Sequence, residues 1–165
     1  MTIEQIYEIA DNRGIAIYAF PMLELRAISL RGGHIAIDRS KFASDVEYKC
    51  ALVHEIGHCV TDSFYNLHTS VPVKELIERQ ANRFAAELLV PFAELRRAFN
   101  RGILFNRILA RMFDVTVEFI NMVLELFEYE LLSAARARQT AHAATEIATN
   151  NLLEFIRNQA PARTG

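Results

Sequence analysis

Three residues near the middle of the sequence have the types and the spacing of a metal-dependent hydrolytic site. His54 and His58 are four positions apart, and Glu55 directly follows the first of them. Because residues four apart share one face of an α-helix, the two imidazoles could bind the same ion, and zinc takes such nitrogen ligands in tetrahedral geometry. Glu55 is rotated by about 100° from His54. It would lie beside the metal and could accept a proton from water, as the general base of a metallopeptidase does.

The competing interpretation of this stretch is a core helix that carries polar residues by chance. The run CALVHEIGHCV, residues 50–60, is otherwise apolar. Glutamate is almost never fully buried unless it is paired, and so Glu55 in an apolar run argues against chance. The HExxH pattern therefore predicts a zinc site with a catalytic base.

A hydrolytic zinc site needs a third protein ligand and an open position for water. Glu78 lies 20 residues after His58, on the next predicted helix, and is our candidate for this ligand. Glu75, nearly one turn earlier, is the rival, and both glutamates could instead belong to an ordinary charged face. Asn82 shares the helical face of Glu78. We expect it to hydrogen-bond the second ring nitrogen of one histidine, a partner that metal-bound histidines usually have.

Peptide hydrolysis also needs a donor that stabilises the developing oxyanion. Tyr65 and His68, on the polar loop between the two helices, are the candidates for this catalytic role. The favoured alternative for each is a packing or surface residue. Cys50, one turn before His54, is interpreted as a small buried apolar residue, although a thiolate there could close the zinc site as a fourth ligand. Cys59 could act as a redox switch.

The two helices that must position these residues can be predicted from periodicity and from their ends. Residues 44–61 form the first, with Ser44 and Glu47 as a capping box. Residues 73–90 form the second, which follows Pro72 and which Pro91 stops. The loop between them, residues 62–72, is long enough to let the second helix return against the first.

A small sheet is predicted before these helices. After an N-terminal helix at residues 2–13, residues 15–21 alternate like a strand. Residues 25–30 and 34–38 flank two glycines and predict a hairpin. The sheet is therefore antiparallel, or mixed if the first strand joins it. An extended substrate could add to the sheet edge formed by residues 34–38.

The second half of the sequence is predicted to be helical, which makes the fold class α+β. Short helices are expected at 92–102 and 106–113, and longer ones at 116–130 and 131–158. We expect a metallopeptidase domain at residues 1–128, with a helical subdomain from about residue 91. Residues 129–165 are expected to form an alanine-rich helical extension with a frayed end.

Three segments, in this order and at this spacing, resemble the ImmA/IrrE family of bacterial metallo-endopeptidases. They are HEIGHC, SFYN and ERQANRFAAELLVP, and the resemblance covers residues 20–128. The family consists of small zincins with a glutamate as third ligand, distantly similar to thermolysin. The resemblance implies a zincin-like minimal metallopeptidase fold, with Zn²⁺ held by His54, His58 and Glu78, and with Glu55 as the base.

The resemblance also implies a substrate. Family members commonly lie beside a helix-turn-helix repressor of a phage or mobile element and cleave it, so a site-specific endopeptidase acting on a DNA-binding repressor is implied. The sequence departs from the family in two places. Many relatives carry an acid near the third ligand, where Gln80 and Asn82 stand here. The tail from residue 131 has no counterpart that we recognise.

Charge and composition bear on the classes of partner. The net charge is −2, from 18 basic and 20 acidic side chains, which calls for neither nucleic acid nor a membrane as partner. The N-terminal segment has no signal-peptide core, and no apolar run reaches the length of a membrane span. We expect a soluble cytoplasmic protein with reduced cysteines, because Cys50 and Cys59 would stand about 13 Å apart on one helix.

Two other functions remain open. Residues 109–126 faintly resemble a helix-turn-helix, but Glu118, Asn121 and Glu125 on its second helix would repel phosphate. We interpret this segment as structural, or as a docking surface for a DNA-binding substrate. The chain could also be a non-catalytic metal-binding regulator that acts by protein–protein or DNA binding, although a pure scaffold has no need of Glu55. The C-terminal helix could pack on the domain or form a homodimer.

Overall fold

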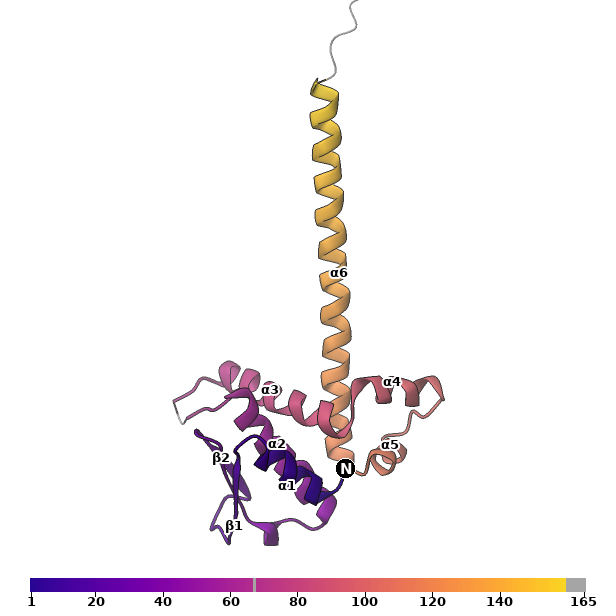
Figure 1. The fold of residues 1–165 in the computed structure, drawn as a ribbon. Helices are drawn as coiled ribbons and strands as arrows, with labels where there is room; N and C mark the ends of the chain where they lie inside the picture. The colour runs from indigo at the N-terminus through magenta and orange to yellow at the C-terminus, as the bar shows by residue number, and fades with distance from the viewer. Residues whose placement is uncertain (67, 160–165) are drawn as a thin grey trace, which may run out of the picture. The chain divides into compact units, whose positions relative to one another are not determined.

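The computed structural model describes residues 1–66 and 68–159, with side-chain positions for all of these except 135 and 141–159. Leu67 and residues 160–165, which include the frayed end in the sequence prediction, lie outside the described residues. The chain divides into two units, Met1–Leu126 and Phe127–Gly165. The elements in chain order (Figure 1) are α1 (Ile3–Asp11), β1 (Ala16–Ala19), β2 (Ala27–Leu30), β3 (His34–Ile37), η1 (Arg39–Lys41), α2 (Asp45–Thr61), α3 (Val71–Leu89), α4 (Phe92–Asn100), α5 (Asn106–Phe113) and α6 (Val117–Gln159).

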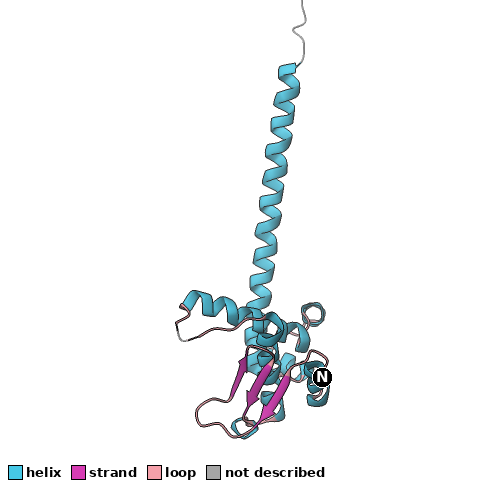
Figure 2. Cartoon of the chain, turned by 60° about the vertical axis from the view of Figure 1, so that its left-hand side comes forward, coloured by secondary structure: helices cyan, strands magenta, loops and turns pink. Residues whose placement is uncertain are grey.

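The three strands form one mixed sheet in the order β1-β3-β2 (Figure 2). The predicted hairpin of β2 and β3 is confirmed, with Gly32 and Gly33 both at positive φ in its turn. β1 joins β3 in parallel, with Ala16 opposite His34. The prediction that residues 34–38 form a sheet edge is therefore wrong, because β1 covers the side of β3 that β2 leaves free. The edges of the sheet are β1 and β2.

The start of α2 is fixed by side chains that satisfy its first N–H groups. Ser44 Oγ accepts a hydrogen bond from the Glu47 N–H at 3.1 Å, as expected of an N-cap. The Glu47 carboxylate reaches one residue further back than a capping box would, and it accepts from the Ala43 N–H at 2.8 Å. α3 begins at Val71, so that Pro72 lies in its first turn and not before it.

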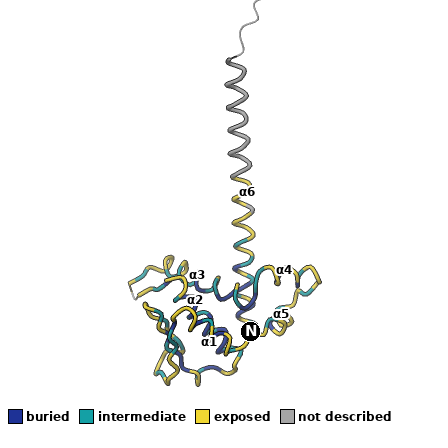
Figure 3. The backbone as a smooth tube through the Cα atoms, viewed as in Figure 1, coloured by how far each residue is buried: buried dark blue, intermediate teal, exposed yellow. Residues whose placement is uncertain are grey.

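Helices α2 and α3 pack closely because small residues meet where they cross. A Cβ atom on Gly57 would lie 2.6 Å from the carbonyl oxygen of Ala81 and 3.0 Å from its Cα. Such separations are too short for any side chain at this position of α2. The buried residues run along α2 and into α3 (Figure 3). On α3, three of them are the alanines Ala81, Ala85 and Ala86. This crossing brings the polar face of α3 against the histidine face of α2.

A buried lysine joins α2 to the turn between α5 and α6. The Lys49 side chain is 2% exposed, and its ammonium forms a salt bridge with the carboxylate of Asp114. It also donates to the backbone carbonyl of Met1 at 3.3 Å. Cys50, the next residue, is buried, and burial raises the pKa of its thiol. This environment fits the interpretation of Cys50 as a small core residue.

The last helix, α6, is continuous from Val117 to Gln159. The sequence predicted helices at 116–130 and 131–158, and no glycine or proline separates them, so nothing ends the first before the second begins. The division between the two units falls inside this helix. No helix among the described residues is long and apolar enough to cross a membrane. The α+β prediction, with a mixed sheet before a mostly helical half, is confirmed.

Candidate metal centre

The two histidines of α2 lie on the same helical face and direct the same ring nitrogen to one point. Their Nε2 atoms are 3.1 Å apart. His58 is buried and His54 is half-buried, because α3 and the loop after α2 cover the rings on their outer sides. The spacing of four residues along one helix therefore gives the convergence that the sequence predicted.

Glu78 of α3 completes this cluster. Its Oε2 lies 3.3 Å from Nε2 of His54, and its Oε1 lies 3.6 Å from Nε2 of His58. In the part of the chain that the structure describes, these three residues are the group of acids, histidines or cysteines whose ligand atoms all lie within 4.8 Å of one another. The rival Glu75 is exposed and outside this group, and Cys50 is also outside it.

The outer nitrogen of each ring has a hydrogen-bond acceptor. Nδ1 of His58 donates to the backbone carbonyl of Ser63 at 2.6 Å, because a carbonyl oxygen can only accept. Nδ1 of His54 lies 2.8 Å from Oδ1 of Asn82, which is the contact expected of Asn82. With the protons on Nδ1, both Nε2 atoms are left as acceptors. Two lone pairs and the Glu78 carboxylate then face one another.

Three acceptors at such short range repel one another unless a cation lies between them. Tetrahedral zinc with ligand distances of 2.0–2.1 Å has its ligands about 3.3–3.4 Å apart. The two nitrogens are 3.1 Å apart, and each lies near a different oxygen of the Glu78 carboxylate, at 3.3 and 3.6 Å, so the separations are close to this value. Two imidazole nitrogens and one carboxylate also form a donor set that zinc accepts and that leaves a fourth position open. The residues present therefore fit a catalytic zinc ion.

The electrostatic surroundings of these residues also favour positive charge at this point. Burial opposes protonation of His54, but the hydrogen bond to Glu78 and the charges of Glu55 and Glu78 together raise its pKa. The hydrogen bond from His54 in turn lowers the pKa of Glu78, against the effect of its own burial. These interactions thus favour the protonated form of His54 and the ionised form of Glu78, and a cation at the cluster would take the place of the proton on Nε2 of His54.

Glu55 is half-buried and lies beside the cluster without belonging to it. Its negative charge contributes to the raised pKa values of His54, Tyr65 and Cys59, which surround it on α2 and the following loop. This carboxylate is therefore free of the ligand group and close enough to it to affect His54 electrostatically. A general base must lie near the reacting water without being a metal ligand, and Glu55 is the candidate for this role.

The structure places Tyr65 at the cluster and His68 away from it. The Tyr65 ring centre is 6.4 Å from that of His58, and its hydroxyl interacts with the Glu78 carboxylate. Burial, then the charge of Glu78 and the hydrogen bond to it, raise the pKa of Tyr65, so its hydroxyl keeps its proton. His68 is exposed on the loop and is not in the ligand group. Its backbone N–H donates to Oδ1 of Asn66 at 2.9 Å.

Sequence reasoning missed three residues that shape this site, which are Asp62, Ser63 and Gly57. The Ser63 carbonyl is positioned by Asp62, which ends α2 in the left-handed conformation and turns the chain back toward His58. The sequence signal for this turn was a polar residue directly after the helix, which is a common pattern and is not specific. Gly57 sets the distance between α2 and α3. A glycine inside a helix weakens the helix, and that cost was a signal of close packing.

Comparisons with known proteins give a family but no individual relative. No curated protein and no solved structure matches the chain. The model of the IrrE N-terminal-like domain, Peptidase_M78, matches residues 14–125, which is more than half of the sequence. The matched range contains both helices of the cluster and all three strands, and a peptidase family agrees with a possible metal site of two histidines and a glutamate. The chain belongs to the Peptidase_M78 family of IrrE N-terminal-like domains.

Proposed function

We propose that this protein is a zinc-dependent endopeptidase that hydrolyses one peptide bond in a regulatory protein. One observation carries the proposal. Two imidazole nitrogens and a carboxylate converge as acceptors within 3.6 Å of one another, and the Glu55 carboxylate lies beside them. Membership of a peptidase family supports the same reaction class.

In this proposal His54, His58 and Glu78 hold the zinc ion. When bound, zinc would lower the pKa of water toward neutrality and polarise the peptide carbonyl. Asn82 and the Ser63 carbonyl keep each Nδ1 protonated and fix the orientation of each ring. The rings are therefore aligned before the ion arrives, which reduces the entropy lost on binding.

The remaining chemistry is assigned to Glu55 and Tyr65. Glu55 removes a proton from the attacking water and later delivers it to the leaving amine. Tyr65 keeps its hydroxyl proton, since its pKa is raised, and can donate a hydrogen bond to the developing oxyanion. A substrate would have to displace the contact between this hydroxyl and Glu78. His68 could stabilise the oxyanion only if its loop moved toward the metal centre.

The substrate class is a further part of the proposal. Resemblance to repressor-cleaving peptidases favours a helix-turn-helix repressor of a phage or mobile element. Either free sheet edge, β1 or β2, could pair with an extended segment of such a substrate.

The test is co-expression with the repressor encoded next to this gene, followed by intact-mass measurement of the repressor. Wild-type protein should give two fragments whose masses add up to the repressor plus one water. Glu55→Gln should give none, while binding zinc as the wild type does. An intact repressor with both proteins, each containing zinc, would contradict the proposed cleavage. It would favour the alternative of a metal-binding regulator that acts without catalysis.

A further inference from the structure

The helices α4 and α5 and their connection carry an exposed surface that the metal centre does not use. They lie at the end of α3 that points away from the sheet (Figure 1). We call it the α4–α5 surface and define it by five arginines and four large apolar residues. These are Arg96, Arg97, Arg101, Arg107, Arg111, Leu104, Phe105, Ile108 and Met112.

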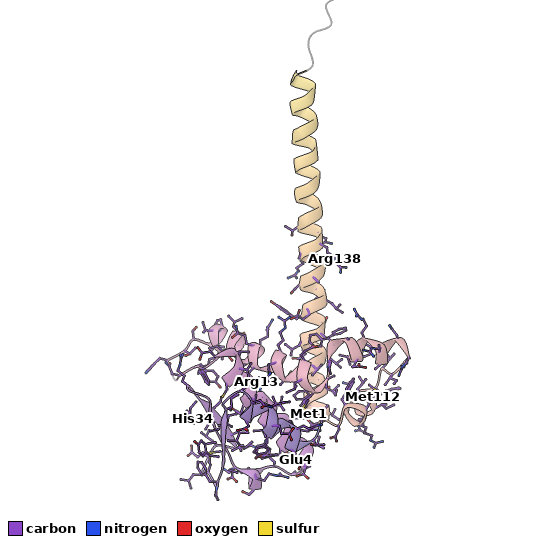
Figure 4. All side chains as sticks on the ribbon, in the orientation of Figure 1. Met1, Glu4, Arg13, His34, Met112 and Arg138 are labelled. Carbon is purple, nitrogen blue, oxygen red and sulfur yellow. The ribbon has the colours of Figure 1, made fainter. Side chains whose placement is uncertain are left out.

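The apolar residues are exposed because α5 turns a different face to the core. Leu109 and Ala110 are buried, which leaves Ile108 and Met112 pointing outward, four residues apart. Ile108 is 49% exposed and Met112 is 45% exposed. Figure 4 labels Met112 among the side chains drawn as sticks. Leu104 and Phe105, just before α5, are 66% and 73% exposed. Single apolar residues on a surface are common, whereas four large exposed ones within residues 104–112 make this segment a candidate interaction site.

The charge of this surface is opposite to that of the rest of the chain. Residues 92–113 contain five arginines and one acid, Glu94, for a charge of +4. Because the whole chain carries −2, the other residues carry −6. Glu94 pairs with Arg97 at 2.8 Å. No salt bridge among the described residues engages the other four arginines.

The opposite charges favour a short acidic segment as the occupant. Electrostatic attraction acts over about 8 Å at physiological salt, so a short segment would sense mainly the arginines. A nucleic acid or an anionic membrane extends much further and would also meet the −6 of the remaining chain. Exposed leucine, phenylalanine, isoleucine and methionine contribute little to binding the phosphates of a nucleic acid. Arginine with aromatic residues and methionine is instead the composition typical of protein interfaces.

We propose that the α4–α5 surface docks an acidic amphipathic helix of a partner protein. Apolar side chains of the partner at helical spacing pack on Phe105, Ile108 and Met112, and its acids pair with the arginines of α4 and α5. This docking does not depend on the metal centre, because a partner can bind here whether or not it is cleaved. If the partner is the substrate, the surface adds affinity and selectivity away from the scissile bond.

The first test is a selection from a displayed library of random peptides of about 16 residues, or about four helical turns, with the full-length protein as bait. Enriched peptides should be acidic and should carry apolar residues at three- and four-residue spacing. A synthetic copy of the most enriched peptide is then titrated by fluorescence anisotropy. Its binding should weaken about tenfold with Arg107→Glu/Arg111→Glu, because two attractive pairs become repulsive, and it should weaken as salt is added.

Matched controls separate this surface from general effects of charge and apolarity. Arg136→Glu/Arg138→Glu changes the net charge equally outside the surface and should leave binding unchanged. Ile108→Gln/Met112→Gln should also weaken binding about tenfold. Leu131→Gln/Leu132→Gln removes two leucines that are 55% and 52% exposed elsewhere, and it should have no effect. Thermal denaturation of each variant checks that its fold is retained.

Three results would overturn the proposal. The first is a selection without acidic amphipathic peptides, or peptides that bind the surface variants as tightly as the wild type. The second is tighter binding of a short duplex DNA or of phosphatidylglycerol vesicles that the same arginine reversals abolish, which would assign the surface to nucleic acid or membrane. The third is self-association in sedimentation velocity that the reversals abolish, which would make a second copy the occupant.

Discussion

Asn82 is the residue at which the proposed metal centre can be tuned without removing a ligand. Its Oδ1 accepts a hydrogen bond from the Nδ1–H of His54, with 2.8 Å between the two atoms. An amide oxygen raises the basicity of the other ring nitrogen less than a carboxylate does. We therefore predict that Asn82→Asp binds zinc more tightly than the wild type, and that Asn82→Ala binds it about 10- to 100-fold more weakly.

Competition with a chromophoric zinc chelator measures both affinities. Gln80→Glu is the matched control, because it adds the same charge two residues away at an exposed position of α3. Affinity changes of the same sign in Asn82→Asp and Asn82→Ala would show that Asn82 does not act through His54.

The two glutamates near the start of α3 differ in their predicted contribution to zinc binding. Glu78 faces both histidines, whereas Glu75 is exposed outside the ligand group. Glu78→Gln should reduce zinc affinity by more than the roughly 10- to 100-fold expected for loss of an outer partner. Glu75→Gln should leave it unchanged. Zinc content after dialysis against a chelator reports the difference, and equal losses in the two variants would contradict the assignment.

The Cys59 thiol is expected to be unreactive near neutral pH. Burial, and then the charge of Glu55, raise its pKa to about 11, so very little thiolate forms at pH 7. We predict slow alkylation of Cys59 by iodoacetamide in the native protein and rapid alkylation after denaturation in urea. Fragmentation of the labelled tryptic peptide 50–74, which contains both cysteines, locates the label on Cys59 in each reaction. Alkylation of native Cys59 as fast as free cysteine would restore the hypothesis of a redox switch.

At the scale of the elements, the crossing of α2 and α3 decides whether the ligands meet. Gly57 lies between the two histidines, and its missing side chain lets the backbone of Ala81 approach. Glu78 and Asn82 flank that contact on α3. Any increase in the distance between the helices would therefore move both residues away from the histidine face.

Gly57→Ala is predicted to damage stability and zinc binding together. The added methyl group would lie 2.6 Å from the Ala81 carbonyl oxygen, and overpacking of this kind costs about 1–3 kcal/mol. Helix propensity alone would make alanine more stable than glycine here by up to about 1 kcal/mol. A net loss of stability would therefore show that the clash with Ala81 outweighs the gain in helix propensity. Urea denaturation and zinc competition measure the two effects.

A second substitution distinguishes the source of the clash. The close atoms of Ala81 belong to its backbone, and so Gly57→Ala/Ala81→Gly should not recover zinc affinity. Full recovery in the double variant would mean that the Ala81 side chain, and not the main chain, sets the helix distance.

At the scale of the first unit, Lys49 ties the helix of the metal centre to the α5–α6 turn. Its ammonium is buried, whereas the Asp114 side chain is 65% exposed. Asp114 has φ of 54°, a left-handed conformation that asparagine also tolerates. Asp114→Asn therefore removes the charge with little disturbance of the backbone, and it leaves a buried ammonium without its counter-ion.

We predict that Asp114→Asn lowers the free energy of unfolding, by less than the roughly 3–5 kcal/mol typical of fully buried pairs. Lys49→Met/Asp114→Asn should be more stable than the single variant, since it also removes the buried charge. Urea denaturation of the apo proteins gives the comparison. A single variant as stable as the wild type would show that solvent already screens Lys49.

The sequence alone determined those features that depend on neighbours along one helix or one hairpin. His54, Glu55 and His58 have their relative directions fixed by the α-helical repeat, and Ser44 caps that helix through a local hydrogen bond. The β2–β3 hairpin follows from its two glycines. Hydrogen bonds over a few residues give these features, so the sequence encodes them with few alternatives.

Only the tertiary structure decided which distant groups meet. The contact of Glu78, and not Glu75, with the histidines depends on the crossing at Gly57. The pairing of β1 with β3 and the burial of Lys49 also join residues far apart in the sequence. The outward face of α5 was also decided by the tertiary structure. Periodicity predicts an amphipathic helix, but it does not predict how much of the apolar side of that helix the core will cover. Packing among many segments selects one arrangement from several that the sequence pattern allows.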